Sequence, residues 1–223
     1  TIGASARNLE QLASFLSVLG IARPDFVFPG CDQYKRPSDA LGLIKRCLRK
    51  LTLPELKSQQ AQGVQRIVGQ TESFNISIIT TNYDLHVELG AVASGTRVCP
   101  TASVLRACQP GTVSSGGPLL SLYRPDSSNE CIRLFKLHGS VNWFQTAAGF
   151  EVEDRLRPTP EFNEERERRW YWIGDAEGHY LTRSDAVIVP PTVVKPELIG
   201  ALGEQWAGAC KAMSEADALW FVG

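Results

Sequence analysis

The stretch Ile76–Asp84 constrains the fold most, because its apolar, β-branched run stops abruptly at polar residues. Such a run is typical of a buried strand. A second stretch, Ile132–Gly139, has the same outline and places His138 just past its apolar run. In open α/β sheets, ligands bind outside the carboxyl ends of the strands. We therefore predict that these two strand ends face one pocket and that the rest of the chain holds them there.

Segments with helical spacing of apolar residues alternate with short apolar runs along the chain. The predicted helices are Asn8–Leu19, Ser38–Leu51, Pro54–Val68, Tyr83–Val92 and Pro196–Ala216. The predicted strands are Ser77–Thr81, Ile132–Leu137, Ala186–Val189 and, as a last buried strand, Ala218–Val222. Strands that alternate with helices favour a parallel arrangement. The predicted fold class is therefore α/β, with a mainly parallel sheet covered by helices on both faces.

Two segments depart from this alternation. Ala93–Asn129 holds clusters of Gly, Ser, Pro and Thr, and we predict a long connection there. Trp143–Asp185 contains a mixed-charge run and an aromatic cluster, which indicates a small subdomain inserted into one domain that spans residues 1–223. The chain begins with Thr and its last apolar run stops at Gly223, so we expect it to be a piece of a longer protein.

Composition narrows the possible partners. The formal net charge of −1 offers no global basic surface for nucleic acid, and the basic residues within 45–50 are interpreted as the solvated face of a helix. No run of about 18 apolar residues occurs, so no transmembrane helix is predicted. None of the six cysteines forms a C-x-x-C pair. Cys47 and Cys210 are predicted to be buried free thiols, and a reducing, cytoplasmic compartment is expected.

The polar residues after the first strand suit a polyhydroxyl ligand. If the chain stays extended, the side chains of Asn82 and Asp84 point the same way. An amide that donates and accepts, together with a carboxylate that accepts, is able to orient ribose hydroxyls. His138 is a candidate general base near neutral pH, and Gly139 permits a sharp turn and close approach of a ligand.

Structural readings compete with each of these assignments. An Asn-x-Asp sequence after a strand is often only a turn or helix cap. A single histidine at a strand end is more often a hydrogen-bonded residue at the rim of the sheet than a base. His86 and His179 have no supporting context and are interpreted as surface or packing residues.

Four segments, in this order, resemble the sirtuin-like NAD-consuming domains of bacterial antiphage defence proteins. They are Thr80-Thr81-Asn82-Tyr83-Asp84, Lys136-Leu137-His138-Gly139-Ser140-Val141-Asn142-Trp143, Pro190-Pro191-Thr192 with Lys195, and Leu219-Trp220-Phe221-Val222-Gly223. The resemblance covers the chain from about residue 76 to its end. It implies a Rossmann-like fold with an inserted module and with NAD lying across the strand ends.

The resemblance also implies roles for individual residues. Asn82 would hold the nicotinamide ribose and help to place the attacking water, while Asp84 would support the same pocket. His138 would be the general base. Thr80 and Thr81 would contribute walls and backbone contacts, Gly139 would lie against the ligand, and Gly223 would open a second glycine turn.

This sequence departs from the sirtuin pattern in two informative ways. The Gly-Ala-Gly-x-Ser phosphate loop is missing, since Gly3-Ala4-Ser5 matches it poorly. Sirtuin deacylases usually carry a four-cysteine zinc module before the later ribose-binding turn, whereas Trp143–Asp185 contains no cysteine. We therefore expect no metal, and we favour hydrolysis of NAD over transfer to an acyl-lysine.

The resulting prediction is an NAD+ hydrolase that uses NAD as its substrate and acts as the NAD-depleting effector of an antiviral defence protein. Expected partners are other domains of the same longer chain and further copies in a homo-oligomer or defence complex, with neither a membrane nor a nucleic acid bound directly. Two alternatives stay open: an NAD-dependent protein deacylase, and a non-catalytic module that binds NAD or ADP-ribose.

Overall fold

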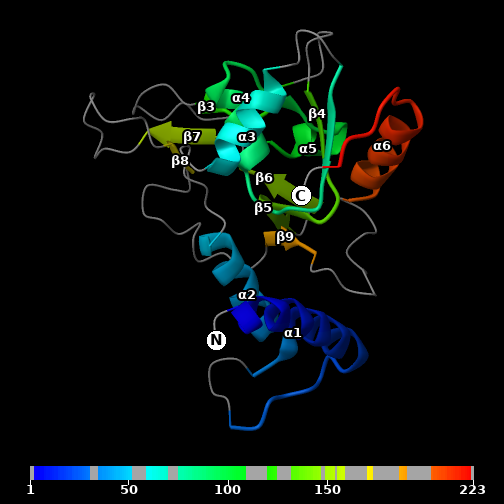
Figure 1. Ribbon diagram of the computed structural model, residues 1–223. Coiled ribbons are helices and arrows are strands. Elements are labelled where there is room, and N and C mark those ends of the chain that lie inside the picture. Colours follow the sequence, from blue (N-terminus) through cyan, green and yellow to red (C-terminus); the bar gives the residue numbers. More distant parts are fainter. Residues whose placement is uncertain are drawn as a thin grey trace.

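The computed structural model describes residues 3–30, 35–51, 59–69, 75–108, 120–124, 132–146, 149–153, 155–158, 170–172, 186–189 and 202–221 (Figure 1). Its helices are α1 (Gly3–Ala22), α2 (Pro37–Leu51), α3 (Gln59–Val68), α4 (His86–Ala93), α5 (Ala102–Ala107) and α6 (Gly203–Ser214). Its strands are β1 (Ser77–Thr80), β2 (Val98–Cys99), β3 (Leu120–Ser121), β4 (Ile132–Lys136), β5 (Gly139–Thr146), β6 (Gly149–Val152), β7 (Arg155–Pro158), β8 (Trp170–Trp172) and β9 (Ala186–Ile188). The protein is therefore of the mixed α/β class.

A parallel sheet of three strands, in the order β1-β4-β2, forms the centre of the fold. Successive side chains of a strand point to opposite faces of the sheet. On one face, Ile132 and Leu134 of β4 join the main core with α3 and α4, through residues such as Leu89. On the other face, Phe135 packs against Ala209 of α6. Figure 1 shows α4 and α6 on opposite sides of β4, so this sheet is covered on both faces as predicted.

The remaining described strands pair antiparallel. β5 lies between β6 and β9, and β7 lies between β3 and β8. The predicted parallel arrangement is thus confirmed for β1, β4 and β2, while β9 pairs antiparallel with β5. The connection through Leu137 and His138 is too short for a crossover, so the chain turns directly from β4 into a second sheet.

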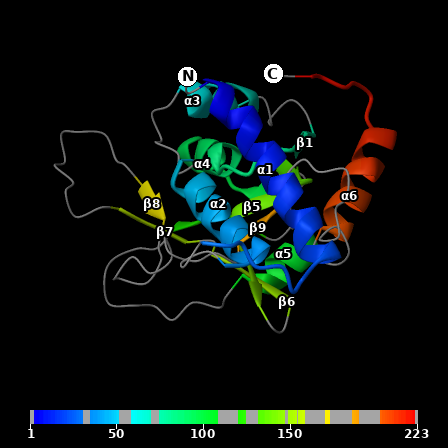
Figure 2. The same ribbon diagram turned by 90° about the horizontal axis from the view of Figure 1, so that it is seen from below.

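Helices α1 and α2 pack against each other at one end of the molecule, as Figure 1 shows and Figure 2 presents from below. Ala13 and Leu16 of α1 meet Ile44 of α2 in a small separate core. The helices predicted over Asn8–Leu19 and Ser38–Leu51 are confirmed, and α1 is longer at both ends.

Several predicted boundaries differ from the structure. The long connection over Ala93–Asn129 contains β2, α5 and β3, and β2 supplies the third strand of the parallel sheet. These elements have six residues or fewer, too short to show periodicity. The predicted start of the third helix, at residues 54–58, and that of the last, at residues 196–201, lie outside the described residues. Trp143, the predicted start of the inserted subdomain, lies buried inside β5, and the subdomain itself stays a prediction.

The strand predicted at Ala218–Val222 is wrong over its described part, residues 218–221, which form neither helix nor strand. The exposed fractions of Leu219, Trp220 and Phe221 are 55%, 82% and 95%, so this part is not buried either. An apolar run indicates a tendency to be buried, but a strand also needs a neighbouring strand for its backbone groups. No described strand pairs with these residues.

The buried face of helix α6 does not include Cys210. Leu202, Gln205, Ala209 and Ala212 turn inward with helical spacing. Cys210 is consequently an exposed free thiol, and its predicted burial is wrong.

Cys99 is disulfide-bonded, which departs from the reducing setting inferred from the cysteine pattern. Within the described ranges, no helix has both the length and the hydropathy that a bilayer crossing requires.

Candidate active site at the ends of β1 and β4

The two strand ends singled out in the sequence lie side by side. β1 and β4 are neighbours in parallel register, with Thr80 opposite Lys136. The pairing continues for one more step, because the Leu137 N–H donates to the Thr80 carbonyl at 2.9 Å. The loop with Asn82 and the turn with His138 therefore leave the sheet at the same edge, and the pocket predicted there stays a prediction.

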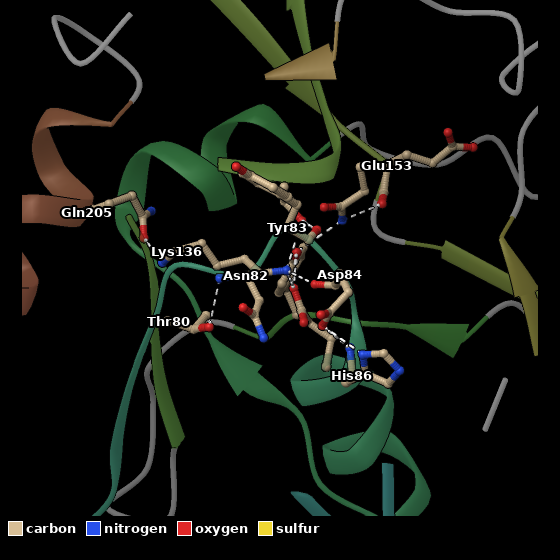
Figure 3. Close-up of polar contacts among 12 residues, drawn as sticks. Thr80, Asn82, Tyr83, Asp84, His86, Lys136, Glu153 and Gln205 are labelled. Atoms are coloured by element: carbon tan, nitrogen blue, oxygen red, sulfur yellow. Dashed lines mark hydrogen bonds and ion pairs between the residues drawn. The ribbon is translucent and has the colours of Figure 1, made fainter. Parts of the chain in front are cut away.

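The loop after β1 leaves Asn82 accessible. Thr80 accepts a hydrogen bond from the Asn82 N–H at its Oγ1 atom, at 3.0 Å, which tightens the chain as it leaves the strand. Thr81 and Asn82 are exposed, and Figure 3 shows the Asn82 side chain beside the backbone of this loop. The Asn82 amide is therefore available to a ligand at this edge.

Asp84 lies two residues before the start of α4 and binds His86. Its Oδ1 atom accepts from the His86 N–H at 3.0 Å and lies 2.9 Å from His86 Nδ1. This is the turn or cap role that competed with ligand binding. β1 ends at Thr80, so the extended backbone assumed for a common direction of the Asn82 and Asp84 side chains does not persist. Both side chains of the Asp84–His86 pair are less than one-fifth exposed.

The assignment of His86 as a residue without supporting context is therefore incomplete. An Asp-x-His sequence at a helix start is the signal that could have indicated the pair. Burial alone would raise the pKa of Asp84. Hydrogen bonds from the ring and backbone of His86, with the positive charge of Lys136, outweigh burial and hold that pKa below its usual value. Asp84 thus stays ionised at neutral pH.

His138 lies in the tight turn between β4 and β5 and is 9% exposed. Its carbonyl accepts from the Val189 N–H at 2.8 Å, and the preceding Leu137 carbonyl accepts from Trp206 Nε1 at 3.0 Å. The imidazole lies beside the Tyr83 ring, with 6.3 Å between ring centroids. Tyr83 in turn donates to the Val189 carbonyl at 3.3 Å. The turn with His138 is thus held by the loop after β1, by the residue that follows β9 and by α6.

Gly139 is required at its position by both conformation and space. Its φ of +82° lies in the left-handed region that favours glycine. A Cβ atom here would lie 1.9 Å from the Val187 carbonyl oxygen of β9, far inside van der Waals contact. The sequence predicted close approach of a ligand to Gly139. On the side where a Cβ would point, strand β9 occupies that space.

A buried ion pair, which the sequence patterns did not indicate, lies beneath both strand ends. The Lys136 and Glu88 side chains are 1% and 0% exposed, and Nζ lies 2.9 Å from Glu88 Oε1. Lys136 Nζ also donates to Ser140 Oγ at 2.9 Å and to the Asp84 carbonyl. A lysine within the apolar run of β4 was the available signal, because lysine is rarely buried without a partner.

The ion pair continues into a buried polar network (Figure 3). Tyr123 donates to Glu88 Oε1 at 3.1 Å, and its hydroxyl accepts from Asn142 Nδ2 at 3.0 Å. Asn142 Nδ2 also donates to the Glu153 carbonyl at 3.0 Å. Burial, followed by the negative charge of Glu88, raises the pKa of Tyr123 well above its ordinary value. Tyr123 therefore remains a hydrogen-bond donor at any physiological pH.

Gln205 ties α6 to the same edge of the sheet. Its Oε1 atom accepts from the Lys136 N–H at 3.1 Å, and its Nε2 atom donates to Thr101 Oγ1 at 2.6 Å.

Gly223, the Pro190-Pro191-Thr192 run and Lys195 lie outside the described residues. Among the described side chains, no three His, Cys, Asp or Glu residues are grouped closely enough to bind a metal ion.

Comparison with known families and with curated proteins adds no relative. No protein-family model matches the chain, and no curated protein matches it.

Proposed function

We propose that this chain is an NAD+ hydrolase with a Rossmann-like fold that cleaves the bond between nicotinamide and ribose. The observation that carries the proposal is the pairing of β1 with β4, which brings Asn82 and the His138–Gly139 turn to one sheet edge. These are the residues on which the resemblance to sirtuin-like domains depends. Sheet edges of this kind are where ligands bind in open α/β folds.

The accessible and buried groups suit this reaction. The exposed Asn82 amide would bind ribose hydroxyls, because it both donates and accepts. His138, nearly buried but retaining 9% exposure, would accept the proton of the attacking water. Asp84 is engaged by His86, so it would support the Asn82 loop instead of binding NAD directly.

The proposed reaction balances with water as the only co-reactant. A water oxygen bonds to the anomeric ribose carbon while the carbon–nitrogen bond to nicotinamide breaks. The bonding electron pair returns to the nicotinamide nitrogen, which becomes neutral, and the water proton passes to His138. The products are nicotinamide, ADP-ribose and a proton. The protein would contribute orientation of the two reacting atoms and exclusion of stray water.

The experiment is a product assay with the full-length protein and NAD. Nicotinamide and ADP-ribose are quantified by chromatography and mass spectrometry for the wild type, Asn82→Ala and His138→Ala. Asn75→Ala is the matched control, because Asn75 is also exposed and lies before β1, at the opposite end of that strand. We expect turnover to be lost in the first two variants and kept in the control. Undiminished turnover in both site variants would refute the assignment.

The products also separate the proposed function from its alternatives. An acetylated peptide is added to a parallel reaction with NAD. Formation of O-acetyl-ADP-ribose in place of free ADP-ribose would replace the proposed hydrolase with a deacylase. Calorimetric binding of NAD without cleavage, both for the purified protein and with extract of phage-infected cells, would replace it with a binding module. The proposed defence role further requires that cellular NAD fall on infection only when Asn82 and His138 are intact.

A further inference from the structure

We propose that Lys136, held by Glu88, is a positioning residue that fixes the Asn82 loop and the His138 turn relative to each other, an inference that rests on the proposed hydrolase function. Lys136 is the last residue of β4, two positions before His138. Its side chain returns beneath the loop that carries Asn82. Its side chain thus links the end of β4 to the loop that follows β1.

The Lys136 ammonium joins separate elements at a single point. Its three acceptors are the Asp84 carbonyl in the β1–α4 loop, Glu88 Oε1 in α4 and Ser140 Oγ in β5. An ammonium has three protons, so all of its donor capacity is used. Ser140 Oγ itself lies 3.3 Å from the Tyr83 carbonyl. Movement of the loop relative to the turn would therefore break contacts to Lys136.

The backbone provides two further links on either side of Asn82. Thr80 is bonded to Leu137 at 2.9 Å, and the Tyr83 carbonyl accepts from the Val141 N–H at 3.0 Å. Asn82 lies between these two points and remains exposed. Lys136 thus supports the segment from Thr80 to Tyr83. Both ends of this segment are bonded to residues on either side of His138, and its middle is accessible to a ligand.

Glu88 makes this arrangement rigid. Its Oε1 atom is shared by Lys136 Nζ and the Tyr123 hydroxyl, and Tyr123 is held by Asn142. Among the described residues, the second oxygen, Glu88 Oε2, is buried without a hydrogen-bond partner. A buried pair that leaves one oxygen unsatisfied is an expensive way to gain stability, since apolar side chains of similar volume often serve as well. What apolar side chains cannot supply is directed hydrogen bonds between the loop and the turn.

The decisive variant removes both charges together. Lys136→Met with Glu88→Gln keeps side-chain volumes close to the original and leaves no unpaired buried charge. The control is Lys211→Met with Glu215→Gln, which removes an exposed ion pair of the same residue types, separated by 3.8 Å, at the end of α6. Each double variant of the full-length protein is compared with the wild type for its urea unfolding midpoint, its kcat and KM for NAD, and its amide hydrogen exchange.

A positioning role predicts a split between these measurements. We expect the buried double variant to remain folded and its kcat to fall roughly 10- to 100-fold, because small misplacements of reacting groups have effects of that size. We expect KM to change by less than about threefold, since the loss concerns the transition state more than ground-state binding. Exchange should accelerate in residues 80–84 and 137–141. The control variant should match the wild type in each measurement.

Wild-type kcat and wild-type exchange in a folded buried double variant would overturn the positioning role. If that variant does not fold, Ser140→Ala decides, because it removes one contact of Lys136 and leaves the ion pair intact. It should lower kcat and accelerate exchange at residues 80–84, and the absence of both effects would refute the role. If the wild type does not cleave NAD, the hydrolase function fails, and the exchange measurement alone then decides whether Lys136 fixes the loop.

Discussion

Substitution of Gly139 by alanine tests the geometry of the turn that carries His138. The added methyl group meets two separate obstacles. The backbone φ of +82° is unfavourable for any residue with a Cβ atom. The new Cβ would also lie 1.9 Å from the Val187 carbonyl oxygen and 2.9 Å from its carbon, so β9 would have to move. Backbone atoms of a paired strand cannot rotate away as a flexible side chain can.

The two obstacles give a magnitude. A left-handed conformation costs an L-residue about 1–2 kcal/mol. Displacement of well-packed neighbours by an extra carbon costs about 1–3 kcal/mol. Their sum is about 2–5 kcal/mol. The free energy of unfolding of a typical native protein is only about 5–15 kcal/mol, so this cost is a large part of it. We therefore expect Gly139→Ala to lower the free energy of unfolding substantially, or to prevent folding at physiological temperature.

Gly95 provides a matched control because it shares only the first obstacle. Its φ is +77°, but no atom lies within 4 Å of a Cβ built there. Urea unfolding of both variants, followed by circular dichroism, should show Gly139→Ala to be the less stable by about 1–3 kcal/mol, the packing contribution alone. Equal destabilisation of the two variants would refute the close approach of β9 to the turn.

Two further substitutions test the packing of α6 and the charge at the start of α4. Gly208→Ala should lower the thermal unfolding midpoint, because the new Cβ would lie 2.4 Å from a Phe135 ring carbon. This clash is expected to outweigh the preference of helices for alanine over glycine, which is about 1 kcal/mol. A raised midpoint would contradict the contact. Asp84→Asn should destabilise the protein near neutral pH but much less in acid. The Asp84 pKa is lowered in the folded state, so its contribution is present above the unfolded pKa of about 3.9 and is lost as pH falls through the folded value. Urea midpoints at about pH 7 and about pH 3 measure this difference, and a difference independent of pH would contradict it.

The position of the candidate site was predictable because it depends on two local patterns. Ile76–Asp84 and Ile132–Gly139 each show a buried run that ends in polar residues, and parallel neighbours necessarily end at the same edge. The paired helices α1 and α2 were predictable for the same reason, since the spacing of Leu16 and Ile44 with their apolar neighbours marks one face of each helix.

Pairing and polar contacts between distant residues were not predictable from such patterns. Ala186–Val189 shows that it will be buried, but nothing in its sequence states that β9 runs antiparallel to β5. The apolar run at 218–221 has the composition of a strand, yet a strand depends on a partner elsewhere in the structure. Lys136 and Glu88 are 48 positions apart, and their ion pair arises only when β4 packs against α4.

Gly139 and Lys136 together hold the buried side of the candidate site, while Asn82 stays exposed to a ligand. β9 approaches Gly139 so closely that the turn cannot shift toward it, and Lys136 holds the β1–α4 loop to that turn. Lys136 and Glu88 form a buried pair of opposite charges, and Asp84 beside them is ionised at neutral pH. In the proposed reaction, positive charge develops on ribose when nicotinamide leaves, and a carboxylate at this edge of the sheet would favour that charge. If Lys136 fixes the loop as proposed, this charge would need no reorganisation as the reaction proceeds.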